Sequence, residues 1–190
     1  MVQRTQLFWK ANKFPIEVSI NYLRFSSRSE KVFDFIIPLL LTGLIMWLVV
    51  SIDPSSSTVL KGIKDINNQT LTFISILAGF NIASISVLAT SGSKLLEDLR
   101  RERSTKFPEK TLFEIMMTFF CAAVVTEFFI IFIGVLLLVI SSIINLPIDF
   151  NINIWWWIII LLWIYMLITT IFVSVRNLKI LFTIMVNEEY

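Results

Sequence analysis

Residues 153–175 read NIWWWIIILLWIYMLITTIFVSV, a run without one charged side chain. Three further runs, at residues 33–52, 71–90 and 115–144, are nearly as apolar: the first carries only Asp34 and the third only Glu127. A hydrocarbon core about 30 Å thick is crossed by about 20 apolar residues in an α-helix. The sequence therefore predicts an all-α membrane protein with four transmembrane helices.

The composition excludes an ordinary soluble protein. Of the 190 residues, 56% are hydrophobic and only 16% are charged, and the mean hydropathy is +0.81. Soluble domains carry about 25% charged residues. A small chain also has too much surface relative to its volume to hide such an apolar excess in a core.

The residues on which many enzymes depend are scarce. The chain has no His and a single Cys, Cys121, which excludes histidine-based catalysis, an intrachain disulfide and most zinc sites. It contains no H-E-x-x-H, G-x-S-x-G or P-loop pattern. We therefore expect a protein that is not an enzyme and that uses no cofactor or metal.

The Lys and Arg residues predict the orientation in the membrane. Of the 16, all but Lys61 and Lys64 lie before the first run, between the second and third, or after the fourth. Cytoplasmic flanks are enriched in basic residues, so both termini and the central link are expected in the cytoplasm. The expected parts are an interfacial or cytoplasmic N-terminal segment at residues 1–32, a transmembrane domain at 33–175 and a cytoplasmic tail at 176–190. A cytoplasmic helical hairpin at residues 91–114 is expected within the transmembrane domain.

The central link reads SKLLEDLRRER at residues 93–103, and the sequence favours a helix there. No Pro interrupts it, and Leu95, Leu96 and Leu99 form one stripe. The second transmembrane helix is therefore expected to run on past the membrane and to form an αα-hairpin with the third. The hairpin is either a solvated charged face or a docking surface for a soluble partner, the candidate docking residues being Leu95, Leu99, Arg100, Arg101 and Arg103.

Two other segments, both outside the apolar runs, show local sequence patterns. Residues 53–70 contain Pro, Gly, a serine run and an Asn pair, which favours an irregular external loop. Residues 14–25 fit both a strand period and a helical stripe, so helix and strand remain alternatives there. Nearby aromatic and basic residues indicate that this segment packs at the cytoplasmic membrane surface.

Small side chains line one face of the second transmembrane helix. Gly79 and Ala83 form the centre of this face, and such faces let helices approach closely, within one chain or between subunits of an oligomer. The predicted packing face consists of Thr72, Ser75, Gly79, Ala83, Ser86 and Thr90.

Glu127 lies near the middle of the third run, where an isolated carboxylate would cost several kcal/mol. Residues at a similar position in the other helices are Asn81, Thr42 and Tyr165, and Asn81 is the expected hydrogen-bond partner. Two interpretations stay open. Glu127 either closes a buried polar network that fixes helix register, or it titrates in an ion or proton path.

A resemblance adds to these observations. The four-span layout and the stretch FISILAGFNIASISVLATSGSKLLEDLR at residues 73–100 resemble the membrane subunit of the Kiwa bacterial anti-phage defence system. The resemblance implies a homo-oligomeric inner-membrane sensor, a tetramer, that holds a cytosolic effector protein. It assigns no residue roles.

Two functions are therefore expected. The first is a non-enzymatic sensor and scaffold of a phage-defence complex that recruits a cytosolic effector. The alternative is a small oligomeric ion or proton channel gated at Glu127. The basic segments lie beside the membrane and are balanced by acidic residues, so lipid is the expected partner and direct binding of nucleic acid is not.

Overall fold

Four long helices form the body of the molecule. The structure is a computed structural model that describes residues 12–143 and 152–187. The expected N-terminal segment, the link at 145–152 and the tail therefore lie partly outside the described residues. Within the described part the chain is helical, without a strand, and four helices are long and apolar enough to cross a membrane: Arg28–Ser51, Ser56–Thr90, Leu112–Ile143 and Ile154–Val186.

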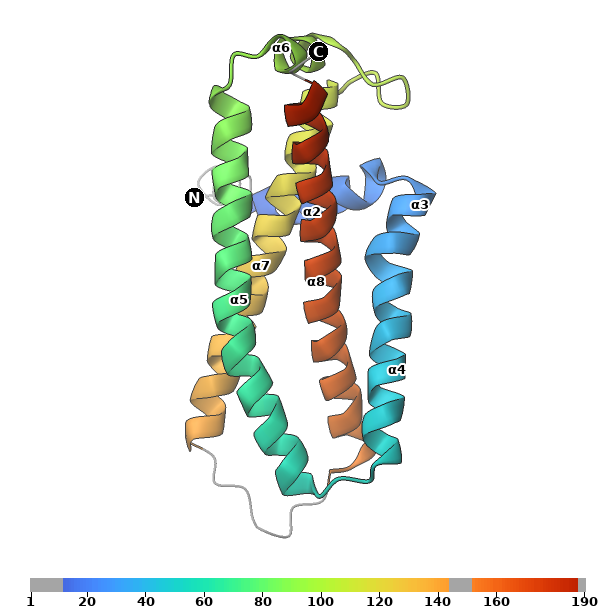
Figure 1. Ribbon diagram of the computed structural model, residues 1–190, viewed down its shortest axis with the longest axis vertical. Helices are drawn as coiled ribbons and strands as arrows, with labels where there is room; N and C mark the ends of the chain where they lie inside the picture. The colour runs from blue at the N-terminus through green and yellow to red at the C-terminus, as the bar shows by residue number, and fades with distance from the viewer. Residues whose placement is uncertain (1–11, 144–151, 188–190) are drawn as a thin grey trace, which may run out of the picture.

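Successive long helices run in opposite directions along the bundle. Helix α4 (Ile37–Ser51) continues a π-helical turn η1 (Val32–Ile36) and the short α3 (Arg28–Lys31). It is followed by α5 (Ser56–Thr90), α7 (Leu112–Ile143) and α8 (Ile154–Asn187). Helix α5 packs against α7, and α8 lies between α7 and α4 (Figure 1).

One end of the bundle carries additional structure, and we call it the α6 end. The short helix α6 (Lys94–Arg101) lies there, and α2 (Phe14–Phe25) crosses the bundle nearby, at the level where α4 begins (Figure 1). Helix α5 has 35 residues and spans about 52 Å, whereas Arg28–Ser51 has 24 and spans about 36 Å. The long helices therefore extend past α2 toward α6.

The α4–α5 connection corrects one prediction. Residues 53–70 were expected to be an irregular loop, but α5 already begins at Ser56. The hydroxyl of Ser55 accepts a hydrogen bond from the backbone N–H of Thr58, so the serine run caps a helix instead of forming a loop. Asn67, inside this helix, is buried and donates to the carbonyl of Gly134 at 3.0 Å.

The central link corrects a second prediction. The second transmembrane helix does not run on, because α5 ends at Thr90 and Ser91 adopts an extended conformation. Ser93 then caps a separate helix, its hydroxyl accepting from the N–H of Leu96. Leu96 is 1% exposed and packs on Leu88 and Phe120, so α6 folds over the bundle end and does not form an αα-hairpin with α7.

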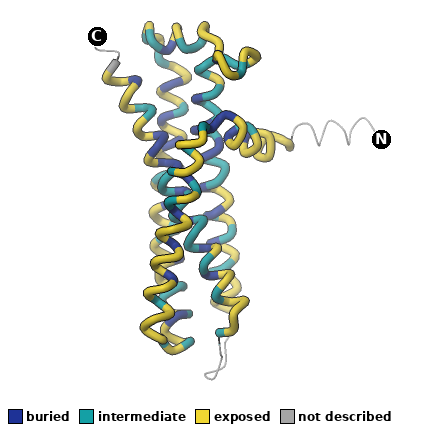
Figure 2. The backbone as a smooth tube through the Cα atoms, turned by 90° about the vertical axis from the view of Figure 1, so that its right-hand side faces the viewer, coloured by how far each residue is buried: buried dark blue, intermediate teal, exposed yellow. Residues whose placement is uncertain are grey.

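The described parts of the N-terminal and C-terminal segments are also helical. Residues 14–25 form the helix α2, with Pro15 in its first turn, which resolves the choice between helix and strand. Helix α8 continues through residues that were assigned to a cytoplasmic tail from 176 onward, and Arg176 is buried within it. Much of the bundle surface consists of exposed residues (Figure 2). They include large apolar side chains such as Leu40, Trp47 and Phe132.

Candidate functional site: a buried polar layer

A group of buried polar side chains lies toward the α6 end of the bundle and meets at α8. Within one turn α8 contributes Ser174, Arg176 and Asn177, which are 3%, 7% and 0% exposed. Four other elements, α2, η1, α5 and α7, supply the partners. We call the resulting group the buried polar layer, and it consists of Tyr22, Asp34, Asn81, Glu127, Ser174, Arg176 and Asn177.

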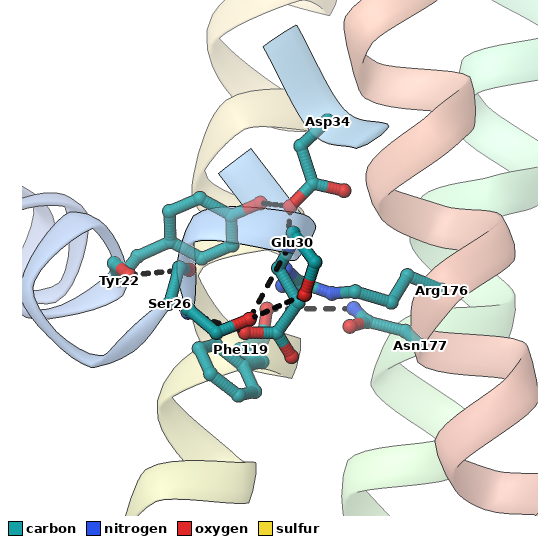
Figure 3. Close-up of polar contacts among 9 residues, drawn as sticks. Tyr22, Ser26, Glu30, Asp34, Phe119, Arg176 and Asn177 are labelled. Atoms are coloured by element: carbon teal, nitrogen blue, oxygen red, sulfur yellow. Dashed lines mark hydrogen bonds and ion pairs between the residues drawn. The ribbon is translucent and has the colours of Figure 1, made fainter. Parts of the chain in front are cut away.

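The first half of the layer is an ion pair between α8 and the start of α4. Asp34 is fully buried, and its Oδ2 accepts hydrogen bonds from Nη1 of Arg176 and from the hydroxyl of Tyr22, the latter at 2.6 Å (Figure 3). Asp34 lies in the π-helical turn η1. Such turns are rare and concentrate at functional sites.

Aromatic rings enclose the guanidinium of Arg176. Its Cζ lies 4.9 Å from the centre of the Tyr22 ring and 4.5 Å from that of the Phe119 ring. The two rings meet edge to face at 5.7 Å. A cation that is removed from water gains about 2 kcal/mol from such contacts, and they reinforce the ion pair with Asp34.

Tyr22 acts as a hydrogen-bond donor in this cluster. Burial raises the pKa of its hydroxyl above the ordinary value of 10.0; the positive charge of Arg176 opposes the shift, and the hydrogen bond to Asp34 adds to it. The phenol therefore keeps its proton at neutral pH. Tyr22 thereby ties helix α2 to the first residues of the α4 span.

The second half of the layer surrounds Glu127 on α7, which is 0% exposed. Its Oε1 accepts from Nδ2 of Asn81 at 2.7 Å and from the hydroxyl of Ser174 at 2.8 Å. Asn177 joins the two halves, because its Nδ2 lies 3.4 Å from the carbonyl oxygen of Phe119 and 3.5 Å from Oδ1 of Asn81.

Not every polar atom of the layer is paired. Within the described part of the chain, five of its side-chain atoms are buried without a hydrogen-bond partner: Oδ1 of Asp34, Oε2 of Glu127, Oδ1 of Asn177, and Nε and Nη2 of Arg176. A buried polar atom left unpaired costs about 1–3 kcal/mol.

The predicted network is only partly the observed one. The structure brings Asn81 and Glu127 together. Thr42 is buried but donates to the carbonyl of Pro38 in its own helix, and Tyr165 is not among the described residues that bond Glu127. The sequence interpretation also missed Asp34 as a site residue, although it is the only charge in the first apolar run, and it assigned Arg176 to a cytoplasmic tail.

The small-residue face of α5 points away from the bundle. The opposite face of the helix, which includes Ala78 and Ser84, is the one that is buried. A Cβ built on Gly79 would have no atom within 4 Å. The predicted packing residues are therefore exposed in the single chain: Thr72, Ser75, Gly79, Ala83, Ser86 and Thr90.

The predicted docking residues divide into two groups. Leu95 and Leu99 are only partly exposed and pack against the core, and Arg100 donates to the carbonyls of Leu88 and Ala89, both at 3.1 Å, at the end of α5. These three therefore have structural roles.

Arg101 and Arg103 remain exposed at the α6 end. Arg101 pairs loosely with Glu97 at 3.7 Å, and Arg103 donates to the carbonyl of Pro108 at 3.0 Å. Of the predicted docking residues, these two are accessible to a partner.

Two cavities flank the layer. One, of about 220 Å³, lies beside α2 and is lined by Leu23, Thr126 and Thr169 among others. The other, of about 420 Å³, lies nearer α6 and is lined by Leu99, Lys179 and Ile184 among others. Glu127 lines neither cavity.

Comparison with known proteins gave no relative. No protein-family model, no curated protein and no solved structure matches the chain. In the described residues the geometry alone defines a helical fold with four membrane-length helices and a polar layer toward one end of the bundle.

Proposed function

We propose that this chain is a non-enzymatic sensor and scaffold subunit of a bacterial inner membrane, with the α6 end in the cytoplasm. The orientation is supported by the positive-inside rule, since Lys61 and Lys64 lie at the far end of α5 and the other 14 basic residues belong to the proposed cytoplasmic side. The resemblance to the Kiwa membrane subunit supports a role in phage defence, as a homo-oligomer that recruits a cytosolic effector.

The observation that carries the proposal is the link between surface and spans at the α6 end. Tyr22 of the crossing helix α2 bonds Asp34 of the α4 span, and Asp34 pairs with Arg176 of α8. A displacement of α2 would therefore disturb the contacts that hold the long helices together. That is the property expected of a membrane sensor whose output is read in the cytoplasm.

The partner surface is proposed to be α6 and the loop that follows it. Its exposed basic residues are Lys94, Arg101, Arg103 and Lys106, and of these Arg101 and Arg103 are the predicted docking residues. Arg100 is excluded because it caps α5. An effector with an acidic surface would complement these residues.

Affinity capture from native membranes tests this assignment. The double variant Arg101→Glu with Arg103→Glu is expected to lose a co-purifying cytosolic protein while its level in the membrane stays unchanged. The matched control is Lys61→Glu with Lys64→Glu at the other end of the bundle, which should retain the partner. Retention in both variants, or loss in both, contradicts the proposal.

The alternative function, a proton or ion path at Glu127, gains no support from the geometry. A titrating group in such a path needs contact with a polar space. The Glu127 carboxyl is fully buried within one chain, bonds Asn81 and Ser174, and lines neither cavity. These contacts favour a structural hydrogen-bond network.

A further inference from the structure

Helix α2 has two apolar faces. One contains Val18, Tyr22 and Phe25, which are buried against α7 and α8. The other contains Ile16, Ile20 and Leu23, at the i, i+4 and i+7 spacing of one helical stripe, and these side chains are 61%, 58% and 48% exposed. The second stripe has no counterpart in the described chain that covers it.

The contacts of α2 define which way its sides point. Leu23 and Ser19 line the cavity of about 220 Å³ together with Thr126 and Thr169, which lie farther from the α6 end than Phe119 does. That side of α2 therefore faces the middle of the spans.

The opposite side of α2 faces the cytoplasmic loop. Arg24 pairs with Glu109 at 3.0 Å, and its guanidinium lies 5.4 Å from the centre of the Phe107 ring, both in the loop between α6 and α7. Glu17 and Asn21 share this side with Arg24 because they lie seven and three residues before it. The helix is thus apolar toward the spans and polar toward the loop.

The direction of α2 agrees with this polarity. The helix lies transverse to the long helices and packs on α7 at the level where α4 begins, and its N-terminal end projects from the bundle (Figures 1 and 2). A helix that lies across membrane-spanning helices runs along the plane of the bilayer, where amphipathic helices bury one face between headgroups and acyl chains.

The charges around α2 favour one kind of surface. Lys13, Arg24, Arg28 and Lys31 are exposed, and the acids in the same segment are Glu17 and Glu30. Arg24 already pairs with Glu109, which leaves Lys13, Arg28 and Lys31 for other ligands. Basic residues beside a span attract the anionic lipids of the cytoplasmic leaflet.

We infer that α2 binds the cytoplasmic surface of the bilayer, with Ile16, Ile20 and Leu23 in the acyl region and Lys13, Arg28 and Lys31 on anionic phospholipid headgroups. The inference deepens the proposed function and rests on its orientation, because it names the surface that the sensor reads. Through Tyr22 this docking is coupled to the ion pair of Asp34 and Arg176.

Site-specific fluorescence on the full-length chain tests the inference. In a Cys121→Ser background, Ile20→Cys and, as the matched control, Glu17→Cys carry the same environment-sensitive dye. The protein is reconstituted in vesicles of phosphatidylcholine, with or without phosphatidylglycerol. The dye at position 20 is expected to be quenched several-fold more by brominated lipid than by iodide, and the dye at position 17 the reverse. Equal iodide quenching at both positions overturns the docking.

A second comparison tests the charge preference. Phosphatidylglycerol should raise lipid quenching at position 20, and the triple variant Lys13→Gln, Arg28→Gln, Lys31→Gln should abolish that increase. An increase that persists in the variant, or no increase in the parent, overturns the anionic-lipid part.

A third measurement separates this inference from the orientation. A Lys61→Cys variant, treated with an impermeant thiol reagent on whole cells, reports which end of the bundle faces outward. Modification supports the proposed orientation. Protection with position 20 still in lipid overturns the orientation, and with it the cytoplasmic leaflet as the surface that is bound, while leaving α2 an interfacial helix.

Discussion

Arg176 and Asp34 are 142 positions apart in the sequence and form an ion pair that is sealed from solvent, their side chains 7% and 0% exposed. The pair joins the first and last of the four long helices. Removing one partner of a buried ion pair leaves an uncompensated charge, which costs about 3–5 kcal/mol, whereas replacing both with apolar residues is often tolerated. The pair therefore holds the first and last long helices together, and the loss of either residue alone should destabilise the bundle.

A double-mutant cycle measures the coupling free energy between Arg176 and Asp34. Arg176→Met alone or Asp34→Leu alone is expected to lower the free energy of unfolding in detergent by about 3–5 kcal/mol, and the double variant by less than either single change. Additive losses would contradict the coupling. The control pair is Arg24 and Glu109, which are both more than half exposed and should show a coupling of about 0–1 kcal/mol.

Substitutions of Glu127 distinguish a structural hydrogen-bond network from a proton path. Both of its hydrogen bonds end on Oε1, so Glu127→Gln retains the acceptor for Asn81 and Ser174 while removing any titration. We expect Glu127→Gln to keep partner binding and to change stability by about 1 kcal/mol or less.

The matched variant Glu127→Leu removes the acceptor as well. It leaves the buried Ser174 hydroxyl without its acceptor and leaves Asn81 Nδ2 only its 3.3 Å hydrogen bond to Ser174, and it should lower stability by about 2–4 kcal/mol. Dye leakage or conductance that wild type shows and Glu127→Gln abolishes would instead establish the channel function.

The sequence correctly predicted a helical protein with four membrane-length helices, because an apolar run long enough to cross a membrane can be recognised from its composition alone. It also predicted the bond between Asn81 and Glu127, since polar residues buried at similar depth have few other partners. The Asp34 and Arg176 pair was missed for a different reason. Both residues lie where an apolar run ends, and an interpretation based on such runs assigns these charges to water, whereas helix α2 and the continuation of α8 bury them.

Two helix boundaries were also predicted wrongly from the sequence. Turn-forming residues at 53–70 predicted a loop, but Ser55 caps a helix and the carbonyl of Gly134 satisfies the amide of Asn67. Only the fold supplies that distant acceptor. Conversely, the continuous helix expected beyond Thr90 is broken because Ser93 offers a capping hydroxyl and Leu96 gains a buried position on Leu88.

The close approach of α5 and α7 at Gly134 predicts a steric effect. A Cβ on Gly134 would lie 2.7 Å from Cδ2 of Leu71 and 3.2 Å from Oδ1 of Asn67. Gly134→Ala should therefore cost about 1–3 kcal/mol in thermal unfolding in detergent, because the side chain of Leu71 has to shift. Gly62→Ala is the control: it meets nothing within 4 Å and should stabilise the helix by about 0.5–1 kcal/mol. Equal effects of the two substitutions would contradict the close approach at Gly134.

Tyr22 predicts a change of stability with pH. Because burial raises the pKa of its hydroxyl in the folded state, the folded protein holds this proton more tightly than the unfolded chain, whose tyrosine titrates near 10.0. This stabilisation is complete below that pH and is lost as the pH rises through the folded pKa.

Stability should therefore fall above pH 10 in wild type and less steeply in Tyr22→Phe. The variant also removes the hydrogen bond to Asp34 and is expected to be less stable at pH 7 by about 1–3 kcal/mol. Unfolding curves between pH 7 and 11 provide the measurement, and parallel curves would refute the assignment.

The exposed small-residue face of α5 predicts the site of self-association. Apolar lipid provides no hydrophobic drive between helices, so close approach along small side chains is the main route to assembly. The hydroxyls of Ser75, Ser86 and Thr90 bond carbonyls of their own helix, which satisfies these three donors within α5. Gly79 at its centre has no neighbour within the chain.

Gly79→Leu is therefore expected to block that approach and to reduce the cross-linked oligomer several-fold without destabilising the single chain. Gly43→Leu is the matched control, because Gly43 is likewise exposed on a span and likewise free of contacts, but belongs to α4. Cross-linking in native membranes and mass measurement in detergent both report the outcome. An oligomer lost in Gly43→Leu and kept in Gly79→Leu would move the interface from α5 to α4, and one kept in both would exclude each helix centre as the contact.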